Sequence, residues 1–331
     1  MGKLSELKVY RTEDVSLEPL QGKSIAILGY GIQGVAQAAN LRDGGFKVIV
    51  GGRLGKSLEQ AKADGFETFS YAEAAQNADI VCLLVPDPAH GDVFGQIKAH
   101  LSGKTLVVAG GLSLFSKLIV PDADCDVVMV APSGPGRLVR SSFLSKQGMV
   151  AAFAVHQDHS GTAKQTALAL CQALGFTQTG VLECRIQDEA ACDVFGEQAV
   201  LCGGMAELVK QAYQTLVDRG YSKEMAYLAT LYELRGLVDL YHHFGIDGMY
   251  ERVSEAARFG GLKNGSRVVD ANVRQNMENV LDEIESGKFM KEFSKESQTG
   301  FAWTKKKMED ARTDELNRLG VQIRKEFRIT P

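Results

Sequence analysis

Short apolar runs alternate with helical patterns over the first half of the chain. Continuous apolar runs of this length, bounded by glycine, proline or charged residues, are typical of strands buried on both faces. Strands that alternate with helices pair in parallel, with helices on both faces of the sheet. We therefore predict an α/β domain on an open parallel sheet. The predicted strands occupy residues 24–28, 47–50, 79–85, 104–109, 126–131 and 149–155, after a polar lead-in over residues 1–22.

Helical periodicity replaces the strand pattern from about residue 184. No further β-type run follows, so we predict an all-helical second domain. The domains are placed at residues 1–183 and 184–331, with the junction at 180–183, and the charged tail after Gly300 is expected to be a solvated helix. The predicted helical segments are residues 188–219, 223–243, 249–258 and 268–286.

A glycine-rich turn joins the first predicted strand to the helix after it. A GxGxxG motif is specific only when a strand precedes it and a helix follows, as here. Its glycines permit a tight turn and the close approach of a pyrophosphate, which the helix N-terminus then binds. This predicts a Rossmann-type dinucleotide site; an ordinary glycine-rich turn is the alternative. The residues assigned to the cofactor are Gly29, Tyr30, Gly31, Ile32, Gln33 and Gly34.

The second predicted strand ends without the acid that usually binds the ribose 2′-hydroxyl of NAD. Arg53, Lys56 and Ser57 follow it instead. These side chains can bind a 2′-phosphate through charge-assisted hydrogen bonds. The pattern favours NADPH over NADH, with solubilising loop cations as the alternative.

Loops that follow the carboxyl ends of parallel strands gather at one edge of a sheet, where ligands bind. The loops at 86–90, 110–113 and 132–137 are therefore expected to face the nicotinamide. From these loops we assign Pro86, Asp87, Gly110 and Gly136 to the cofactor site.

Asp193 and Glu197 are four residues apart in a predicted helix, so both carboxylates leave the same face. No Lys or Arg lies between Arg185 and Lys210 to compensate them. A hard divalent cation such as Mg²⁺ prefers oxygen ligands of this kind. The pair thus indicates metal or substrate chemistry, against the alternative of a solvated acidic helix face.

The composition excludes several function classes. The formal net charge of −4 gives no basic footprint for nucleic acid. No run of about 18 apolar residues indicates a membrane span. The six cysteines form no CxxC pair and no zinc spacing, and the N-terminus lacks an apolar signal core. We expect a cytoplasmic protein with a small-molecule substrate, and no nucleic-acid or membrane partner.

The whole pattern resembles the short-form ketol-acid reductoisomerases of branched-chain amino-acid synthesis, over nearly the whole chain. The strongest shared segment is 193–204, which reads Asp193-Val-Phe-Gly-Glu-Gln-Ala-Val-Leu-Cys-Gly-Gly204. Further markers are the segments 29–34, 40–43, 129–132, 134–136, 138–140, 207–210 and 224–227.

The resemblance implies a Rossmann domain followed by a knotted helical domain that forms an intimate homodimer. It implies NADPH and, in the usual member, two Mg²⁺ ions. Those enzymes migrate an alkyl group in a 2-acetolactate-type substrate and then reduce the resulting 2-keto acid. It assigns Asp193, Glu197 and Glu233 to the metal and Ser254 to the substrate, with Glu233 reaching the site from the partner subunit.

Three positions depart from the family pattern. Gly110 stands where the family has the proposed catalytic histidine, Ser133 where it has a lysine, and Ala229 where it has the second glutamate of the metal-completing helix. Alkyl migration needs Lewis-acid metals and a base, whereas hydride transfer needs an oriented cofactor. All three losses concern the isomerase half.

We therefore predict an NADPH-dependent reductase that has lost the isomerase step. It is expected to reduce a C=O or C=N bond, an imine being one candidate, in specialised metabolism. The missing glutamate weakens the Mg²⁺ site, and the catalytic residues are predicted to be Asp193, Glu197, Glu233 and Ser254. The alternatives are a true Mg²⁺-dependent ketol-acid reductoisomerase and a non-catalytic NADP(H)-binding sensor or partner protein.

Overall fold

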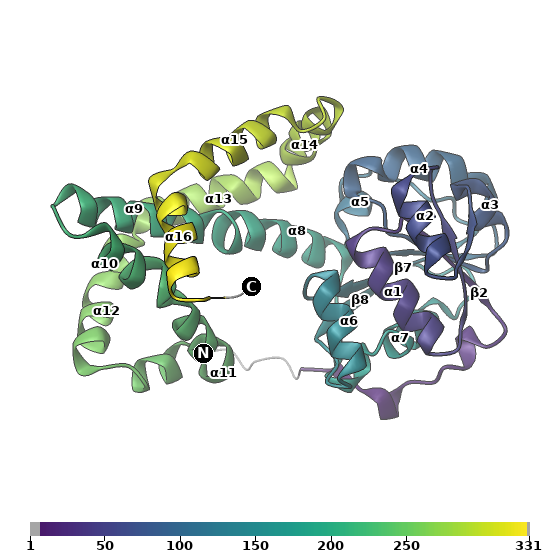
Figure 1. The fold of residues 1–331 in the computed structure, drawn as a ribbon. Coiled ribbons are helices and arrows are strands. Elements are labelled where there is room, and N and C mark those ends of the chain that lie inside the picture. The colour runs from purple at the N-terminus through teal and green to yellow at the C-terminus, as the bar shows by residue number, and fades with distance from the viewer. Residues whose placement is uncertain (1–6, 330–331) are drawn as a thin grey trace. The chain divides into compact units, whose positions relative to one another are not determined.

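The computed structural model describes residues 7–329. The chain forms two compact units, Met1–Cys192 and Asp193–Pro331, each described here by itself (Figure 1). Residues 1–6 of the predicted lead-in and the last two residues of the predicted tail lie outside the described part of the chain.

A nine-stranded sheet forms the centre of the first unit within residues 7–329, with helices on both of its faces (Figure 1). The strand order is β1-β9-β8-β7-β6-β5-β2-β3-β4. The strands are β1 (Val9–Tyr10), β2 (Ser24–Leu28), β3 (Lys47–Gly51), β4 (Glu67–Phe69), β5 (Ile80–Leu83), β6 (Thr105–Val108), β7 (Asp126–Pro132), β8 (Ala151–Gln157) and β9 (Val181–Glu183).

Strands β4, β3, β2, β5, β6 and β7 run parallel, and this is the strand order of a Rossmann domain. In register, Ile27 of β2 lies between Val50 of β3 and Cys82 of β5. The order changes direction at β2, so the carboxyl ends of β2 and β5 flank the switch point where such sheets bind ligands.

Alternation along β2 fills both faces of the sheet. Ile25 and Ile27 pack in one apolar cluster, whereas Ala26 and Leu28 pack in the cluster on the other face. Each of these side chains is fully buried, and burying an Ile or Leu contributes about 1.5–3 kcal/mol. This two-sided burial explains why β2 reads as a continuous apolar run rather than an alternating one.

The prediction of the parallel sheet is confirmed, but its edges differ. Strand β1 falls inside the predicted polar lead-in and pairs antiparallel with β9, which itself falls in the predicted junction. Strand β8 pairs antiparallel with β7, so the sheet is mixed on this side. The helices of the unit are α1 (Ile32–Asp43), α2 (Lys56–Ala63), α3 (Tyr71–Gln76), α4 (His90–Ile97), α5 (Leu112–Phe115), α6 (Gly136–Leu144) and α7 (Ala163–Ala173).

The second unit is all-helical in its described part, as predicted. Helix α8 runs from the first unit into it, and two π-helical turns, Glu197–Leu201 and Leu228–Tyr232, interrupt the α-helical pattern. The predicted helix over 249–258 is wrong, because residues 252–254 separate two helices there. The helices are α8 (Ile186–Gly196), α9 (Gly204–Asp218), α10 (Lys223–Tyr227), α11 (Leu234–Glu251), α12 (Glu255–Val268), α13 (Ala271–Glu285), α14 (Lys288–Gln298), α15 (Ala302–Thr313) and α16 (Glu315–Glu326).

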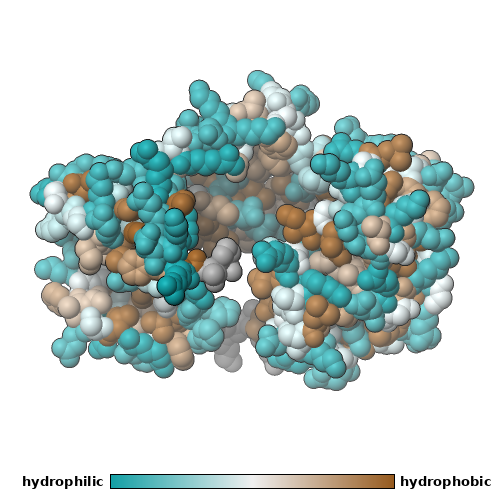
Figure 2. All heavy atoms as spheres, viewed as in Figure 1, coloured by the Kyte–Doolittle hydropathy of each residue, from teal (hydrophilic) through white to brown (hydrophobic). Residues whose placement is uncertain are grey.

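The apolar core of the helical unit is small. One cluster joins α9, α10 and α16 through Val209, Tyr213, Tyr227 and Leu316, among others. Most of the exposed large hydrophobic side chains that the structure describes belong to this unit, and Figure 2 shows hydrophobic residues on its viewed surface. Within residues 7–329, none of the helices combines the length and the apolar content that crossing a membrane requires.

Candidate cofactor and metal site

The turn between β2 and α1 requires glycine at two positions. Gly29 has φ +100°, and a Cβ there would lie 2.8 Å from the backbone nitrogen of Val85. A Cβ on Gly34 would lie 1.9 Å from the carbonyl oxygen of Gly29. Gly31 is the N-cap of α1 and no side chain caps the helix, so its first-turn amides can bind an anion. The turn has the geometry of a pyrophosphate site.

The loop after β7 lies against this turn. The side-chain amide of Gln33 donates a hydrogen bond of 3.1 Å to the carbonyl of Gly134. A Cβ on Gly136 would lie 2.0 Å from the carbonyl oxygen of Ile32, so only glycine permits this close approach of α6 to α1. Two segments assigned to the cofactor from sequence are therefore brought together.

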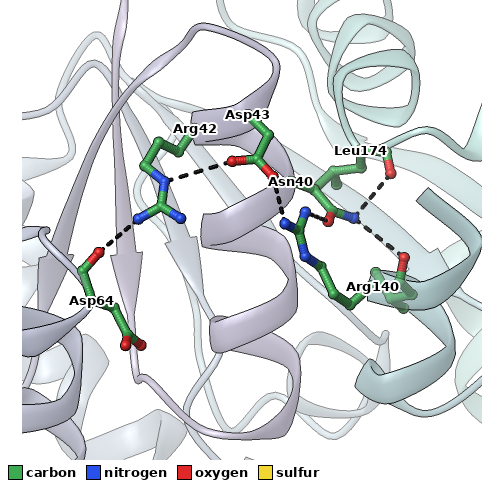
Figure 3. Close-up of polar contacts among 7 residues, drawn as sticks. Asn40, Arg42, Asp43, Asp64, Arg140 and Leu174 are labelled. Atoms are coloured by element: carbon green, nitrogen blue, oxygen red, sulfur yellow. Dashed lines mark hydrogen bonds and ion pairs between the residues drawn. The ribbon is translucent and has the colours of Figure 1, made fainter. Parts of the chain in front are cut away.

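A polar network holds α6 against α1 (Figure 3). Arg140 of α6 donates to the Oδ1 of Asn40 at 2.8 Å and pairs with Asp43. Asn40 is fully buried, and its amide donates to the carbonyls of Val139 and Leu174. Asn40, Asp43 and Arg140, which belong to two of the sequence markers, thus have a structural role in joining these helices.

The side chain of Tyr30 faces the protein interior. Its ring is 6% exposed and packs edge-on against Phe66, with ring centroids 5.8 Å apart. Its hydroxyl donates a 2.7 Å hydrogen bond to Asp64 Oδ2. Any contact of Tyr30 with a cofactor would thus be made by its backbone.

The residues predicted to bind the 2′-phosphate are exposed, in contrast to Tyr30. They lie in the loop before α2 and at the start of that helix, and they are Arg53, Lys56 and Ser57.

The loop after β5 contains a buried histidine that the sequence reasoning missed. The Nε2 of His90 lies 2.8 Å from the carbonyl oxygen of Val85, and its Nδ1 lies 3.9 Å from Asp87 Oδ1. Burial lowers the pKa of His90 below its ordinary value, opposed by Asp87 and by the hydrogen bond to Val85. His90 therefore fixes the turn from Val85 to Asp87; in sequence it looks like an ordinary first residue of a helix.

The loop after β6 is held by a second residue that was missed. The backbone amide of Gly111 donates a 2.6 Å hydrogen bond to Glu189 Oε2 of α8. A Cβ on Gly110 would have only Glu189 Oε1 nearby, at 3.7 Å. The sequence contained one signal for Glu189. It lies four residues before Asp193, the same spacing that separates Asp193 from Glu197.

The acids assigned to the metal lie next to the π-helical turns. Asp193 lies in the last part of α8, Glu197 begins one π-turn, and Glu233 directly follows the other. All three are exposed in the single chain. Single π-turns inside α-helices are frequently found at functional sites. Ser254 is the N-cap of α12, and its Oγ accepts from the amide of Ala257 at 3.2 Å.

Carboxylate oxygens suit Mg²⁺, but the described residues of one chain do not assemble a complete ligand set. Among residues 7–329, no group of three or more His, Cys, Asp or Glu side chains is arranged to hold a metal ion. Asp193 and Glu197 thus form a pair that Glu233 of the same chain does not complete. The metal assignment stays a prediction.

Comparison with known proteins decides the family. Residues 19–180 match the family model of the acetohydroxy acid isomeroreductase NADPH-binding domain, and residues 186–329 match that of the ketol-acid reductoisomerase C-terminal domain. The chain belongs to the ketol-acid reductoisomerase family. The predictions of an NAD(P)H-dependent oxidoreductase and of NADPH as cofactor are confirmed by these matches and by the NADP(+)-dependent relatives.

Members of this family resemble the chain over nearly its full length. The ketol-acid reductoisomerase (NADP(+)) of Pyrobaculum arsenaticum is 44% identical over 321 residues, covering 96% of this chain and 98% of its own. That of Pyrobaculum aerophilum is 43% identical with the same coverage. A solved NADH-preferring ketol-acid reductoisomerase from an uncultured archaeon has a TM-score of 0.90 and 38% identity, covering 96% of this chain and 99% of its own.

These matches correct the predicted function. A reductase that has lost the isomerase step is the wrong interpretation, because full-length identity of 44% to a named ketol-acid reductoisomerase favours the true enzyme, which was the alternative. The non-catalytic sensor is set aside for the same reason. Imine reduction gains no support either, since a pyrroline-5-carboxylate reductase from Coxiella burnetii, at 18% identity and a TM-score of 0.52, shares the fold alone. The error was to infer an absent reaction from three predicted departures from the family pattern.

Proposed function

We propose that this chain is an NADPH-dependent ketol-acid reductoisomerase. It would migrate an alkyl group in a 2-acetolactate-type substrate and reduce the 2-keto acid that results. The single observation that carries the proposal is the 44% identity to such an enzyme, collinear over 96% of this chain and 98% of the relative.

The first unit would bind and orient the cofactor. The amides at the start of α1 bind the pyrophosphate, and Arg53, Lys56 and Ser57 bind the 2′-phosphate. Pro86, Asp87, Gly110 and Gly136 lie in the loops that follow β5, β6 and β7 and would position the nicotinamide. Orientation of the nicotinamide beside the substrate is what hydride transfer asks of the protein.

The acidic residues would hold the metal. Mg²⁺, when bound, supplies Lewis-acid polarisation of the substrate oxygens. Asp193 and Glu197 of one chain would bind it, and Glu233 of a second copy would complete the ligand set. Ser254 uses one lone pair of its hydroxyl as a helix cap, and the O–H can still donate to the substrate.

A homodimer with shared active sites follows from this arrangement. The proposal is supported by the lack of a three-acid group within residues 7–329 of one chain. It is also supported by the exposed hydrophobic side chains of the helical unit, because large exposed apolar patches mark interaction sites. Among these, Ile246 is 69% exposed and Phe259 68% exposed. A second copy of the chain would cover them.

We also propose that the enzyme diverges from the family pattern at three positions. Gly110, Ser133 and Ala229 would replace a catalytic histidine, a lysine and a metal-binding glutamate. Proton transfer would then fall to the carboxylate group of Asp193, Glu197 and Glu233.

Two further expectations, on the domain boundary and the cellular location, accompany this function. The boundary between cofactor domain and helical domain is proposed at 183/184, because β9 ends at Glu183 and the two matched family regions end at 180 and begin at 186. A cytoplasmic location is proposed, since the cysteines the structure describes are free thiols, as in a reducing compartment.

The test is a steady-state assay of NADPH oxidation with 2-acetolactate and Mg²⁺. We expect turnover that chelation by EDTA abolishes and that Asp193→Asn reduces at least tenfold. Asp188→Asn is the matched control, because Asp188 lies on the same helix and its carboxylate pairs with Arg185 at the surface. The control variant should keep nearly full activity.

NADPH binding, followed by fluorescence titration, separates a failed fold from a failed proposal. Protein that binds NADPH but does not convert 2-acetolactate in the presence of Mg²⁺ would refute the proposed function.

A further inference from the structure

Tyr30 belongs to the glycine-rich turn, but its side chain connects that turn to another part of the cofactor domain. The hydroxyl donates a 2.7 Å hydrogen bond to Asp64, which is the C-cap of α2. Burial, followed by the hydrogen bond and the charge of Asp64, raises the pKa of Tyr30 well above its ordinary value. The hydroxyl therefore remains a donor throughout the pH range in which the protein would work.

Asp64 is itself held by two other residues. Gln60 Nε2 donates to Asp64 Oδ1 at 2.7 Å. Arg42 of α1 donates to the carbonyl oxygen of Asp64 at 2.7 Å, a contact drawn in Figure 3, and its guanidinium lies 4.6 Å from the ring centroid of Phe66. The C-terminal end of α2 is thus fastened to α1 and to the turn that precedes it.

The other end of α2 carries the residues proposed to select the cofactor. Lys56 and Ser57 are the first two residues of α2, and Arg53 lies in the loop before it. The helix contains eight residues, so it is about 12 Å long and moves as one rigid body. A shift at Asp64 therefore moves Lys56 and Ser57 relative to Gly29 and Gly31.

The loop before α2 provides little restraint of its own. Arg53, Leu54, Gly55 and Lys56 are exposed, and Leu54 is 94% exposed. Gly55 has φ +146°, and nothing lies within 4 Å of a Cβ built there. The position of α2 is therefore set by Leu58 and Ala61, which pack against the apolar core, and by the contacts of Asp64 at the C-terminal end.

We infer that Tyr30 is a positioning residue for cofactor selectivity: through Asp64 it sets the spacing between the pyrophosphate turn and the cations that bind the 2′-phosphate. The inference rests on the proposed roles of Arg53 and Lys56, and it is independent of the isomerase reaction. Relatives named for NADP(+) and for NADH preference both exist, so this spacing bears on a property that varies in the family.

The test measures the dissociation constants of NADPH and NADH by fluorescence titration of the full-length protein. In Tyr30→Phe the ring remains and only the hydroxyl is lost. We expect the preference for NADPH over NADH to fall at least threefold, with NADH affinity changed less than twofold. Asp64→Ala should give the same result, whereas Asp64→Asn keeps an acceptor for the hydroxyl and should retain most of the preference.

Tyr10→Phe is the matched control at the opposite edge of the same sheet. Tyr10 is also buried, at 8% exposure, and its hydroxyl donates to Glu183 at 3.1 Å. Loss of the Tyr10 hydroxyl should lower thermal stability but leave the cofactor preference unchanged. An unchanged preference in Tyr30→Phe, or an equal change in Tyr10→Phe, overturns the inference. Arg53→Ala serves as the reference: if it also fails to change the preference, the proposed 2′-phosphate site is wrong instead.

Discussion

The backbone amide of Gly111 and the carboxylate of Glu189 form a 2.6 Å hydrogen bond that joins the loop after β6 to α8. The contact leaves no space at Gly111, where a Cβ would lie 2.7 Å from the carbonyl oxygen of Ile186. The adjacent Gly110 has space for a side chain, and its φ angle is not positive. Two neighbouring glycines thus have opposite tolerance for a side chain.

The first prediction compares alanine at these two positions. Gly111→Ala should destabilise the protein by about 1–3 kcal/mol, because the added methyl group overpacks the contact with α8. Gly110→Ala should change the free energy of unfolding by no more than about 1 kcal/mol, in the stabilising direction. Urea denaturation of both variants measures the difference. Equal losses of stability would contradict the open space beside Gly110.

The second prediction concerns Arg53. The unmodified protein should bind NADPH at least tenfold more tightly than NADH, which corresponds to about 1.4 kcal/mol. Arg53→Ala should remove most of this preference by deleting a charge-assisted contact to the 2′-phosphate. Lys62→Ala removes an exposed cation from the far end of α2 and is the control. Equal affinities of the unmodified protein for the two cofactors would refute the assignment.

The third prediction concerns the network between α1 and α6. Asn40→Ala should lower the free energy of unfolding by at least about 2 kcal/mol, because Arg140 keeps only Asp43 as an acceptor and the carbonyls of Val139 and Leu174 lose a buried amide donor. Asn264→Ala is the control: Asn264 also accepts from an arginine, Arg267, but at an exposed position. The control should stay within about 0.5 kcal/mol of the unmodified protein. Similar losses in both variants would show that the buried network contributes no more than a surface contact.

The fourth prediction concerns assembly. Light scattering should find a homodimer, and Phe259→Glu should weaken it by placing a charge on a surface that a second copy would cover. Val120→Glu introduces the same charge on the first unit, at a residue 61% exposed, and should leave the assembly unchanged. A monomer with full activity would remove the basis for shared active sites.

The fifth prediction concerns pH and His90. Burial, the main cause, lowers the pKa of His90 in the folded protein, so the unfolded chain binds a proton first as the pH falls. The stability linked to neutral His90 is complete above about pH 6.5 and is lost as the pH falls from there to the folded-state pKa. His90→Gln should therefore flatten the stability change between about pH 7.5 and 5.5, measured by chemical denaturation. An identical slope in the variant would exclude His90 as a contributor.

The parallel part of the fold could be predicted because its causes are local. Residues 25–28 of β2 are all apolar because both faces of the strand are buried. Gly29 and Gly34 can be recognised in the sequence because the turn accepts only glycine at these positions. Strand β1 could not be predicted in the same way. It has only two residues, and it exists because Val9 pairs with Leu182, far along the chain.

The site was predictable only in part, for a related reason. Asp193 lies in α8 and Glu197 begins the π-helical turn that follows it directly, so their spacing in sequence still indicates their spacing in space. Glu189 continues that spacing but was overlooked, and His90 gives no sequence signal for its contact with Val85. Glu233 does not complete a metal site within residues 7–329, so the metal role predicted for it would need a second copy of the chain. The departure proposed at Gly110 names a side chain that this position lacks, but it does not identify a residue that could take over its role.

For protein engineering, the close backbone approaches at Gly34 and Gly136 divide the proposed cofactor site into a part that must stay fixed and a part that can vary. A methyl group at either glycine would collide with a carbonyl oxygen at 1.9 or 2.0 Å, so libraries randomised there would consist almost entirely of inactive clones. Positions 53, 56 and 57 are exposed and can accept nearly any side chain. Libraries designed to change the preference between NADPH and NADH should therefore randomise these three positions and keep both glycines fixed.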